Sequence, residues 1–490
     1  MGPFDSCIYQ NVERPLKWIA FVMLLAAIAP LTARLRRHPN DVPKLCMLAG
    51  LLPWDFVHLF MSIVGFPDWP GHVAGIEFSL LDGIAIALYL ALPAAREPLP
   101  FKLSMGAYFL ANIVSVFQAD VPMAAVFYVW QLARMFLVYA AFTKACADPR
   151  VPIALVKGVA MGLILEAGYV IFQRFGLGII QAAGTFSAQN FLGLMSHFAV
   201  FPVFALLLVR RQGPLITIAA LAGIVVELFT TSRATVGLAA LGYSTLFLIS
   251  AFRKWTSRKA RMLAVGLAVI AVAAPIAVSS FQERFTHFES QAWYNPNQED
   301  ERIQFERVAA RMLADHPFGV GPNHYVISAN HDGYNVQEQI PLDKDDLLAI
   351  VHNVYWLIAD ESGYAGIVTF VLLLLQPLIL AFRVGWHHRG DIRGDLLLGI
   401  ATSFLVVYIH SLYEWIFITF EAQYLFVLST AMVVGLSRQL SYQPGSQKKA
   451  WRIPSAGVST NGRAGDHARS GGFASRQLST CSLADPNVNT

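Results

Sequence analysis

The chain has 490 residues, of which 56% are hydrophobic and only 14% are charged, and its mean hydropathy is +0.51. This balance excludes an ordinary soluble globular protein, in which about a quarter of the residues are charged. The formal net charge of +4 fits a membrane protein with basic loops and does not indicate a nucleic-acid partner. The cysteines show no paired spacing, which excludes a disulfide framework and a thiolate metal site. They are Cys7, Cys46, Cys146 and Cys481.

Apolar runs long enough to cross a bilayer recur along the sequence. They predict an all-α polytopic integral membrane protein with about 12–13 transmembrane helices, at about 20 residues for each span. The expected spans are residues 17–32, 44–65, 73–92, 101–118, 121–143, 151–175, 190–209, 214–230, 234–252, 261–280, 353–382, 395–412 and 418–437. The first run has no convincing cleavage site, so we expect no cleavable signal peptide.

Lysines and arginines lie in alternate loops, and this alternation predicts the orientation of the chain. Residues 34–44 and 253–261 are basic, whereas the turns around Pro67–Pro70 and Tyr413–Ile416 contain neither lysine nor arginine. The basic loops are therefore expected in the cytoplasm. A long polar loop, residues 281–350, is expected on the outer face, because lipid cannot satisfy its backbone polar groups.

These patterns divide the chain into five parts. The parts are N-terminal transmembrane helices (1–150), a transmembrane core (151–280), a large extracytoplasmic loop (281–350), C-terminal transmembrane helices (351–437) and a cytoplasmic tail (438–490). The tail is rich in Ser, Gly, Arg and Asn and has few large apolar residues, so we expect it to be disordered. We find no internal repeat of the kind that marks inverted-repeat transporters.

Two short polar segments lie at the expected outer ends of spans. Gly184–Asn190 precedes one span, and a turn followed by a helix cap is the plainer interpretation of its glycine and of Asn190. Thr230–Arg233 interrupts a tight connection between two spans. A charge at the membrane edge costs about 2.5–3.5 kcal/mol, so Arg233 either has a partner or a function, or extends to the lipid headgroups.

A third segment, residues 301–313, lies within the large loop. Its apolar residues recur with helical spacing, and Pro317 follows the expected end of the helix. Arg307 and Arg311 lie one turn apart on one face, and Arg302 lies on another. The planar guanidinium of arginine fits phosphate oxygens and stays charged. Weak surface pairs with neighbouring glutamates are the alternative interpretation.

The fourth segment, His352–Gly366, begins the next span. Histidine titrates near neutral pH and is the usual side chain for moving a proton. With Asn353, Glu361 and two spaced glycines close by, His352 is better interpreted as functional than as an interface residue. Glu361 is expected to be buried and paired with one of the arginines.

The loop also offers a possible metal site. His316–Tyr325 contains glycines, among them Gly321, that can bring backbone amides close to a ligand. Asp343, Asp345 and Asp346, with three nearby histidines, are potential ligands for a divalent cation. No ligand spacing such as H-E-x-x-H is present. A solvated acidic turn is therefore the better interpretation, and we expect no metal.

In their order, spacing and common face, these four segments resemble the O-antigen ligase and Wzy-type polymerase superfamily, over roughly residues 170–437. The resemblance implies a metal-independent, inverting glycosyltransferase without cofactors, in the inner membrane of a bacterium, with the large loop in the periplasm. It implies a polyprenyl-diphosphate-linked glycan as donor, lipid A core or another glycan as acceptor, membrane lipid as surroundings, and no nucleic acid.

The resemblance also assigns roles to residues. Arg233 and Arg302 would bind the donor diphosphate, with Arg307, Arg311 and Arg174 as further candidates, and His352 would orient or deprotonate the acceptor hydroxyl. Asn190, Gly321, Asn353 and Glu361 would support them. Physical chemistry agrees with this division, because arginines positioned in advance stabilise the negative charge that develops on a leaving diphosphate.

Several functions remain open. The sequence does not separate a ligase from a polymerase of O-antigen or exopolysaccharide units, or from a transferase that acts on protein, because these differ mainly in the acceptor. A polysaccharide or lipid transporter is the alternative of a different class, and it would place ionisable residues near the midplane of the membrane. The enzyme interpretation requires Arg233, Arg302 and His352 to converge on one outer cavity.

Overall fold

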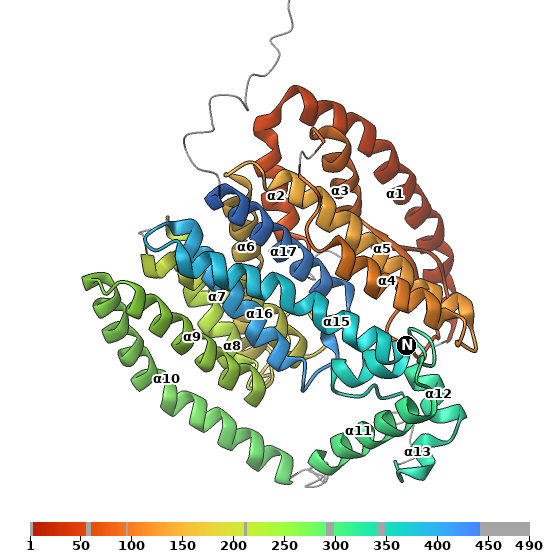
Figure 1. Cartoon of the computed structure of the whole chain (residues 1–490). Helices are drawn as coiled ribbons and strands as arrows, with labels where there is room; N and C mark the ends of the chain where they lie inside the picture. Colours follow the sequence, from red (N-terminus) through yellow and green to blue (C-terminus); the bar gives the residue numbers. More distant parts are fainter. Residues whose placement is uncertain are drawn as a thin grey trace, which may run out of the picture. The chain divides into compact units, whose positions relative to one another are not determined.

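The computed structural model describes residues 3–54, 60–94, 97–209, 213–290, 298–340 and 348–441. Packed helices make up most of this part of the chain (Figure 1). The predicted fold class is confirmed: the protein is all-α and polytopic. The predicted tail lies outside the described residues from residue 442 onward.

Among the described residues, eight helices are long and apolar enough to cross a membrane. They are α1 (Pro3–Arg37), α5 (Pro122–Ala145), α6 (Val151–Ile171) with the π-helical turn η2 (Phe172–Gly176), α7 (Gln189–Val209), α9 (Arg233–Arg253), α15 (Val354–His387), α16 (Ile392–His410) and α17 (Phe420–Ser441). Three further apolar helices are shorter. They are α3 (Leu80–Ala91), α4 (Lys102–Val116) and α8 (Pro214–Phe229). The chain is therefore a multi-pass membrane protein.

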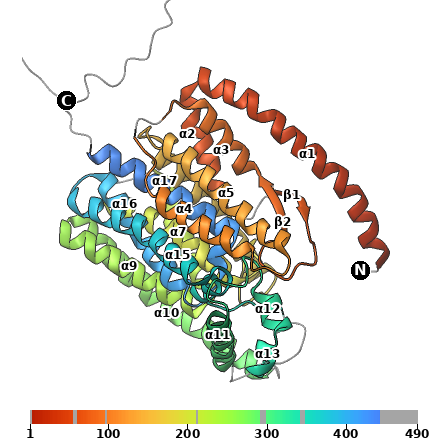
Figure 2. The same cartoon turned by 45° about the vertical axis from the view of Figure 1, so that its right-hand side comes forward.

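The predicted helical span at residues 44–65 is wrong. After the short turn η1 (Pro39–Asp41), helix α2 (Val42–Leu51) stops just before Pro53, which cannot continue a helix. The chain then forms strand β1 (Phe60–Gly65), which pairs antiparallel with β2 (Gly75–Ser79) (Figure 2). A strand fits here because Phe60–Gly65 is a short apolar run that contains an aromatic residue and the β-branched Ile63 and Val64.

Two helices that frame the candidate site pack in close contact. A methyl group on Gly399 of α16 would come within 2.7 Å of Ala205 Cβ on α7. Small residues let helix backbones approach closely inside a membrane, where lipid is as apolar as the side chains and packing drives association. This contact joins the last part of α7 to the first part of α16, so the two helices run antiparallel, and the start of α7 and the end of α16 lie at the same end of the pair.

A buried ionic cluster joins α3, α5 and α17. Arg134, 3% exposed, donates to Asp82 at 2.8 Å and to the Tyr424 hydroxyl at 2.5 Å. Tyr424 in turn contacts Asp82 at 2.8 Å and Ser79 at 2.7 Å. The Glu77 carboxylate lies 3.7 Å from the Arg134 guanidinium. Every charged side chain in the cluster lies beside an opposite charge, so the cluster needs no partner from outside the protein.

The predicted large polar loop, residues 281–350, begins inside α10 (Ser257–Ser290), and much of its described remainder is helical. It contains α11 (Gln298–Asp315), α12 (Tyr325–His331) and α13 (Tyr334–Gln337), and α11 and α12 lie against the beginning of α15 (Figure 1). Tyr334 joins α13 to α11 by donating to Asp315 at 2.9 Å. Burial, reinforced by that carboxylate, raises the pKa of Tyr334 to about 12.

Candidate functional site

A single carboxylate, Glu414, brings together three of the four predicted polar segments. It lies in the turn between α16 and the 3₁₀ turn η3 (Ile416–Ile418), and its side chain is 5% exposed. Asn190 donates to its Oε1 at 2.6 Å, His352 Nδ1 lies 3.3 Å from its Oε2, and the Arg302 guanidinium lies 3.6 Å from its Oε1. Residues from four distant parts of the sequence therefore meet at one anionic group.

Asn190 is held in place by the segment that precedes it. Gln173 makes two hydrogen bonds to the backbone of Gly184, each 2.8 Å long, and Glu166 accepts from the Thr185 amide at 3.0 Å and its hydroxyl at 2.5 Å. Gly184 has φ +63°, and a methyl group there would come within 2.1 Å of the Glu166 carboxylate. The segment is thus folded back onto α6 and η2, and this fold positions Asn190 at the start of α7.

His352 immediately precedes the N-cap of α15. The cap is Asn353, whose side chain accepts from the amides of Tyr355 and Trp356 and donates to Glu306 at 3.2 Å. The imidazole of His352 is 37% exposed. When Nδ1–H donates to Glu414, the lone pair of Nε2 can accept a hydrogen bond or a proton. No described residue makes a hydrogen bond to Nε2.

Arg302 projects from the first part of α11 and keeps 45% of its side chain exposed. Glu306, one turn further along the same face, receives the Asn353 hydrogen bond, which attaches α11 to the start of α15. The guanidinium is near enough to Glu414 to feel its charge, yet open enough to contact a ligand.

The other arginines of α11 have different surroundings. Arg311 contacts Glu338 at 2.6 Å and Gln337 at 3.2 Å, and its side chain is 52% exposed. Arg307 is exposed, and among the described residues its guanidinium makes no hydrogen bond or ion pair. The structure therefore brings Arg302 to Glu414, whereas the described contacts of Arg311 lie at α13.

Arg233 is the first residue of α9 and is exposed. Ser232 caps the helix by accepting from the Thr235 amide at 3.4 Å, and a methyl group on Gly193 would come within 2.0 Å of the Thr235 hydroxyl. Gly193 lies one turn after Asn190 on α7, so α9 begins at the same end of the bundle as Glu414. No described side chain makes a hydrogen bond or ion pair with Arg233.

Gly321 belongs to a loop that repairs a break in α15. Gly363 has φ +67° and ψ −172°, a conformation open only to glycine, and it divides α15 into two segments. The loop satisfies the backbone groups released by this break. Val320 donates to the Asp360 carbonyl at 2.8 Å, Gly321 donates to the Glu361 carbonyl at 3.1 Å, and Tyr364 donates to the Pro317 carbonyl at 3.1 Å.

The break at Gly363 bends α15 sharply. The rings of Tyr355 and Phe370 lie 6.2 Å apart between centroids, although 15 residues of straight helix would separate their backbones by about 22 Å. The first segment, with His352 at its beginning, therefore folds back beside the second. Because non-helical backbone inside a membrane must be buried in protein, the pairing with the loop is what permits this bend.

Glu361 is buried as expected, but its partner is a histidine and not an arginine. Its Oε2 lies 3.0 Å from Nε2 of His72, and both side chains are 1% exposed. The Tyr325 amide donates to Oε1 at 3.3 Å. His72 comes from the connection between β1 and β2, a long-range contact that no local sequence pattern indicates.

The predicted alternative metal ligands have other surroundings. His324 uses both ring nitrogens within the fold: Nε2 accepts from the Val121 amide at 3.1 Å, and Nδ1 lies 2.9 Å from the Pro322 carbonyl. Asp343, Asp345 and Asp346 lie outside the described residues. Within the described ranges, no three His, Cys, Asp or Glu side chains are grouped as a metal site would require.

Glu414 is the residue that sequence reasoning missed. The turn Tyr413–Ile416 contains neither lysine nor arginine, but it does contain this acid. A single acidic residue in a short turn between two apolar spans was the available signal.

Comparison with known proteins identifies a family for part of the chain. Residues 215–371 match the model of the family described as O-antigen ligase. The match begins in α8 and includes Arg233, Arg302, Gly321, His352 and Glu361, whereas Asn190 and Glu414 lie outside it. No curated protein matches the chain.

Proposed function

We propose that this chain transfers a glycan from a polyprenyl-diphosphate carrier to an acceptor hydroxyl at the outer face of a bacterial inner membrane, and the match of residues 215–371 to the O-antigen ligase family supports this proposal. The observation that carries this proposal is the Glu414 cluster, which unites a half-exposed arginine and a half-exposed histidine. The arginine suits a diphosphate and the histidine suits an acceptor hydroxyl.

His352 is the proposed general base or acceptor-positioning residue. Glu414 accepts from Nδ1–H, fixes the tautomer and orientation of the ring, and leaves Nε2 to take the acceptor proton. The acceptor oxygen then forms a bond to the anomeric carbon, while the bond from that carbon to the diphosphate oxygen breaks. Attack from the face opposite the diphosphate inverts the anomeric configuration.

Arg302 is the proposed main ligand of the departing diphosphate. Its exposed guanidinium can offer two parallel hydrogen bonds to phosphate oxygens and offset the charge that develops there. Arg233, Arg307 and Arg311 are further candidates, because each is exposed. No metal is required in this scheme, since the arginines and the imidazole supply the charge stabilisation and the proton transfer.

The test is glycan transfer in purified membranes with a chelator present. Polyprenyl-diphosphate-linked glycan serves as donor, and either lipid A core or a second glycan-lipid serves as acceptor. We expect His352→Ala to lower kcat by about 10²–10⁴-fold, the usual contribution of a positioned acid or base. Product on lipid A core identifies a ligase, and a lengthened glycan-lipid identifies a polymerase.

Arg302→Ala and Arg311→Ala form a matched pair, because both residues lie on α11 and each is about half exposed. Arg302→Ala should lower transfer strongly, since Arg302 lies at Glu414, and Arg311→Ala should lower it less. Equal losses in the two variants would place the donor along the whole of α11. Movement of labelled glycan-lipid across the bilayer without any transfer would contradict the enzyme and identify a transporter.

A further inference from the structure

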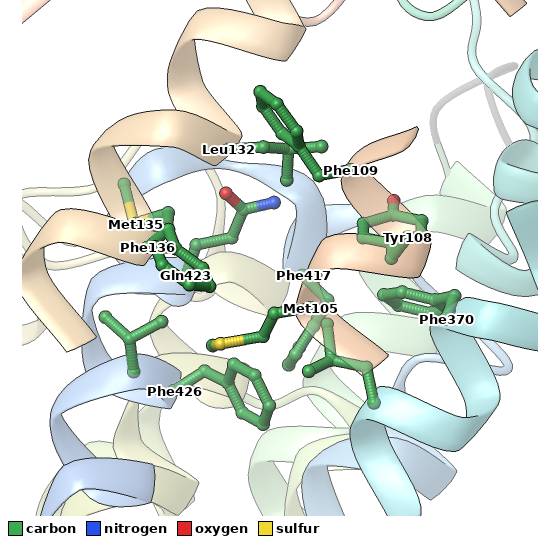
Figure 3. Close-up of a pocket in the computed structure, with 12 residues that line it drawn as sticks. Met105, Tyr108, Phe109, Leu132, Met135, Phe136, Phe370, Phe417, Gln423 and Phe426 are labelled. Carbon is green, nitrogen blue, oxygen red and sulfur yellow. The ribbon is translucent and has the colours of Figure 1, made fainter. Parts of the chain in front are cut away.

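An apolar cavity of about 60 Å³ lies between α4, α5, α15 and α17 (Figure 3). Its floor consists of the rings of Phe370, Phe417 and Phe426, which are at most 4% exposed. On α5, Leu132 is partly buried and Phe136 is 37% exposed, so this side of the cavity opens toward the surface of the helix bundle. That surface is apolar and faces lipid.

The polar groups of the cavity are already satisfied. The Gln423 amide donates to the Tyr128 hydroxyl at 3.3 Å and accepts from Gln131 at 3.0 Å. The hydroxyls of Tyr108 and Tyr128 lie 3.0 Å apart. The cavity therefore has no unmet hydrogen bond to offer a polar ligand, and its chemistry suits a hydrocarbon chain.

Packed aromatic side chains link the cavity to the candidate site in two places. Tyr355, three residues after His352, places its ring 6.2 Å from that of Phe370 because α15 bends at Gly363. Phe417, three residues after Glu414, lies 5.9 Å from Phe370 between ring centroids. Aromatic side chains therefore lead from His352 and from Glu414 to the floor of the cavity.

We propose that this cavity holds an isoprene segment of the donor's polyprenyl chain while its diphosphate lies at Arg302 and His352. The inference rests on the proposed function and adds the place where the lipid is recognised. A narrow cavity accepts one chain, and a donor enters it only if its polar head can occupy the adjoining site. Phenylalanine faces and the thioethers of Met105 and Met135 suit the double bonds and methyl branches of isoprene.

The expected contribution to affinity is modest. Lipid tails are as apolar as the cavity, so a chain that leaves the bilayer gains packing contacts but no hydrophobic transfer energy. We therefore expect an obstructed cavity to raise KM for the donor about threefold to tenfold, which corresponds to no more than about 1.4 kcal/mol, and to leave kcat unchanged.

Leu132→Trp would obstruct the cavity, and Val126→Trp is the control, because Val126 lies on the same helix, is 37% exposed and does not line the cavity. Each variant is assayed with a full-length polyprenyl donor and with a donor that carries a single isoprene unit. Leu132→Trp should raise KM about threefold to tenfold for the long donor only. Equal changes for both donors, or no change for the long donor, would overturn the proposal.

A binding experiment separates this proposal from the transfer activity. Polyprenyl diphosphate with a photoreactive diazirine in its chain is crosslinked to the intact protein without acceptor, and labelled peptides are identified by mass spectrometry. Labels on the α4 and α5 residues that line the cavity, lost in Leu132→Trp, support the proposal even if no glycan transfer is found. Labels elsewhere, or equal labelling of the cavity by a diazirine phospholipid, would overturn it even if transfer occurs.

Discussion

The Arg134 cluster and the Glu414 cluster each contain an arginine beside a carboxylate, but their charges are completed in opposite ways. Arg134 is 3% exposed, and its guanidinium bonds to Asp82 at 2.8 Å. Arg302 is 45% exposed and stays 3.6 Å from Glu414. In the first cluster the protein provides every partner. In the second, one carboxylate is shared by an arginine, a histidine and an amide, and both the arginine and the histidine keep exposed surface.

This difference separates structural charges from candidate functional charges in a membrane protein. A charge inside the bundle is tolerated only with full pairing, since its desolvation is expensive. A charge at the end of the bundle can remain partly unpaired, because water or a ligand completes it. The open cluster is therefore expected to control activity and the closed cluster stability, and substitutions can test that division.

Breaking the closed cluster should have the largest effect on stability. Arg134→Ala leaves Asp82 buried without its charge partner, and we expect a loss of about 3–5 kcal/mol in unfolding free energy. Thermal unfolding in detergent measures it. Arg302→Ala is the control and should change stability by less than about 0.5 kcal/mol, as at an ordinary surface position. Similar losses of stability in both variants would contradict the division into a structural and a functional cluster.

Neutralising the open cluster should affect activity and leave stability nearly unchanged. Glu414→Gln keeps a side chain that can accept from Asn190, but it removes the charge that orients His352 and Arg302. A small misplacement of a reacting group costs about a hundredfold in rate, and we expect a decrease in kcat of that size.

Glu338→Gln is the matched control for Glu414→Gln, because Glu338 is also buried and paired with an arginine of α11, but at α13. Single-turnover transfer rates should decrease in the Glu414 variant and stay within about threefold of the unmodified protein in the control, as expected for a side chain away from the reacting groups. A larger decrease in the Glu338 variant would move the functional site along α11 toward Arg311.

The bend of α15, which positions His352 in the open cluster, can be tested at Gly363. A methyl group there would come within 2.4 Å of the Pro317 carbonyl, in a backbone conformation reserved for glycine. Gly363→Ala should cost about 1–3 kcal/mol of stability. It should also lower activity, because His352 lies on the displaced segment. Gly237→Ala, which meets no atom within 4 Å, should not destabilise the protein.

The smallest effect is expected at the cap of α16. Asp391 accepts from the Arg393 amide at 2.8 Å, and its hydrogen bond to the Arg393 side chain lowers its pKa. Asp391→Ala should cost about 1 kcal/mol at neutral pH, as for other helix caps. Because the folded pKa is lowered, this stability is present above the ordinary carboxyl range and is lost as the pH falls through the folded pKa. The measurement is the unfolding free energy of both proteins as a function of pH. If Asp391→Ala were still less stable than the unmodified protein at the lowest pH, the charge of Asp391 would not be the source of the difference.

Much of the architecture could be predicted because it depends on local chemistry. Runs of apolar residues determine the polytopic helical class. Residue types at span ends indicated His352 and Asn190 as site candidates, and a helical pattern in the large loop indicated Arg302. The span at residues 44–65 was mistaken, because hydropathy alone cannot distinguish a short helix and a strand from one long helix.

What the sequence determined by itself is the class of the protein, its helical segments and the polar residues at their ends, since each follows from composition and spacing within one segment. Only the tertiary structure decided the partners: Glu414 for Asn190, His352 and Arg302, and His72 for Glu361. These contacts join residues 62 to 289 positions apart. Such pairings depend on how helices pack and on where α15 bends, and no local pattern encodes them.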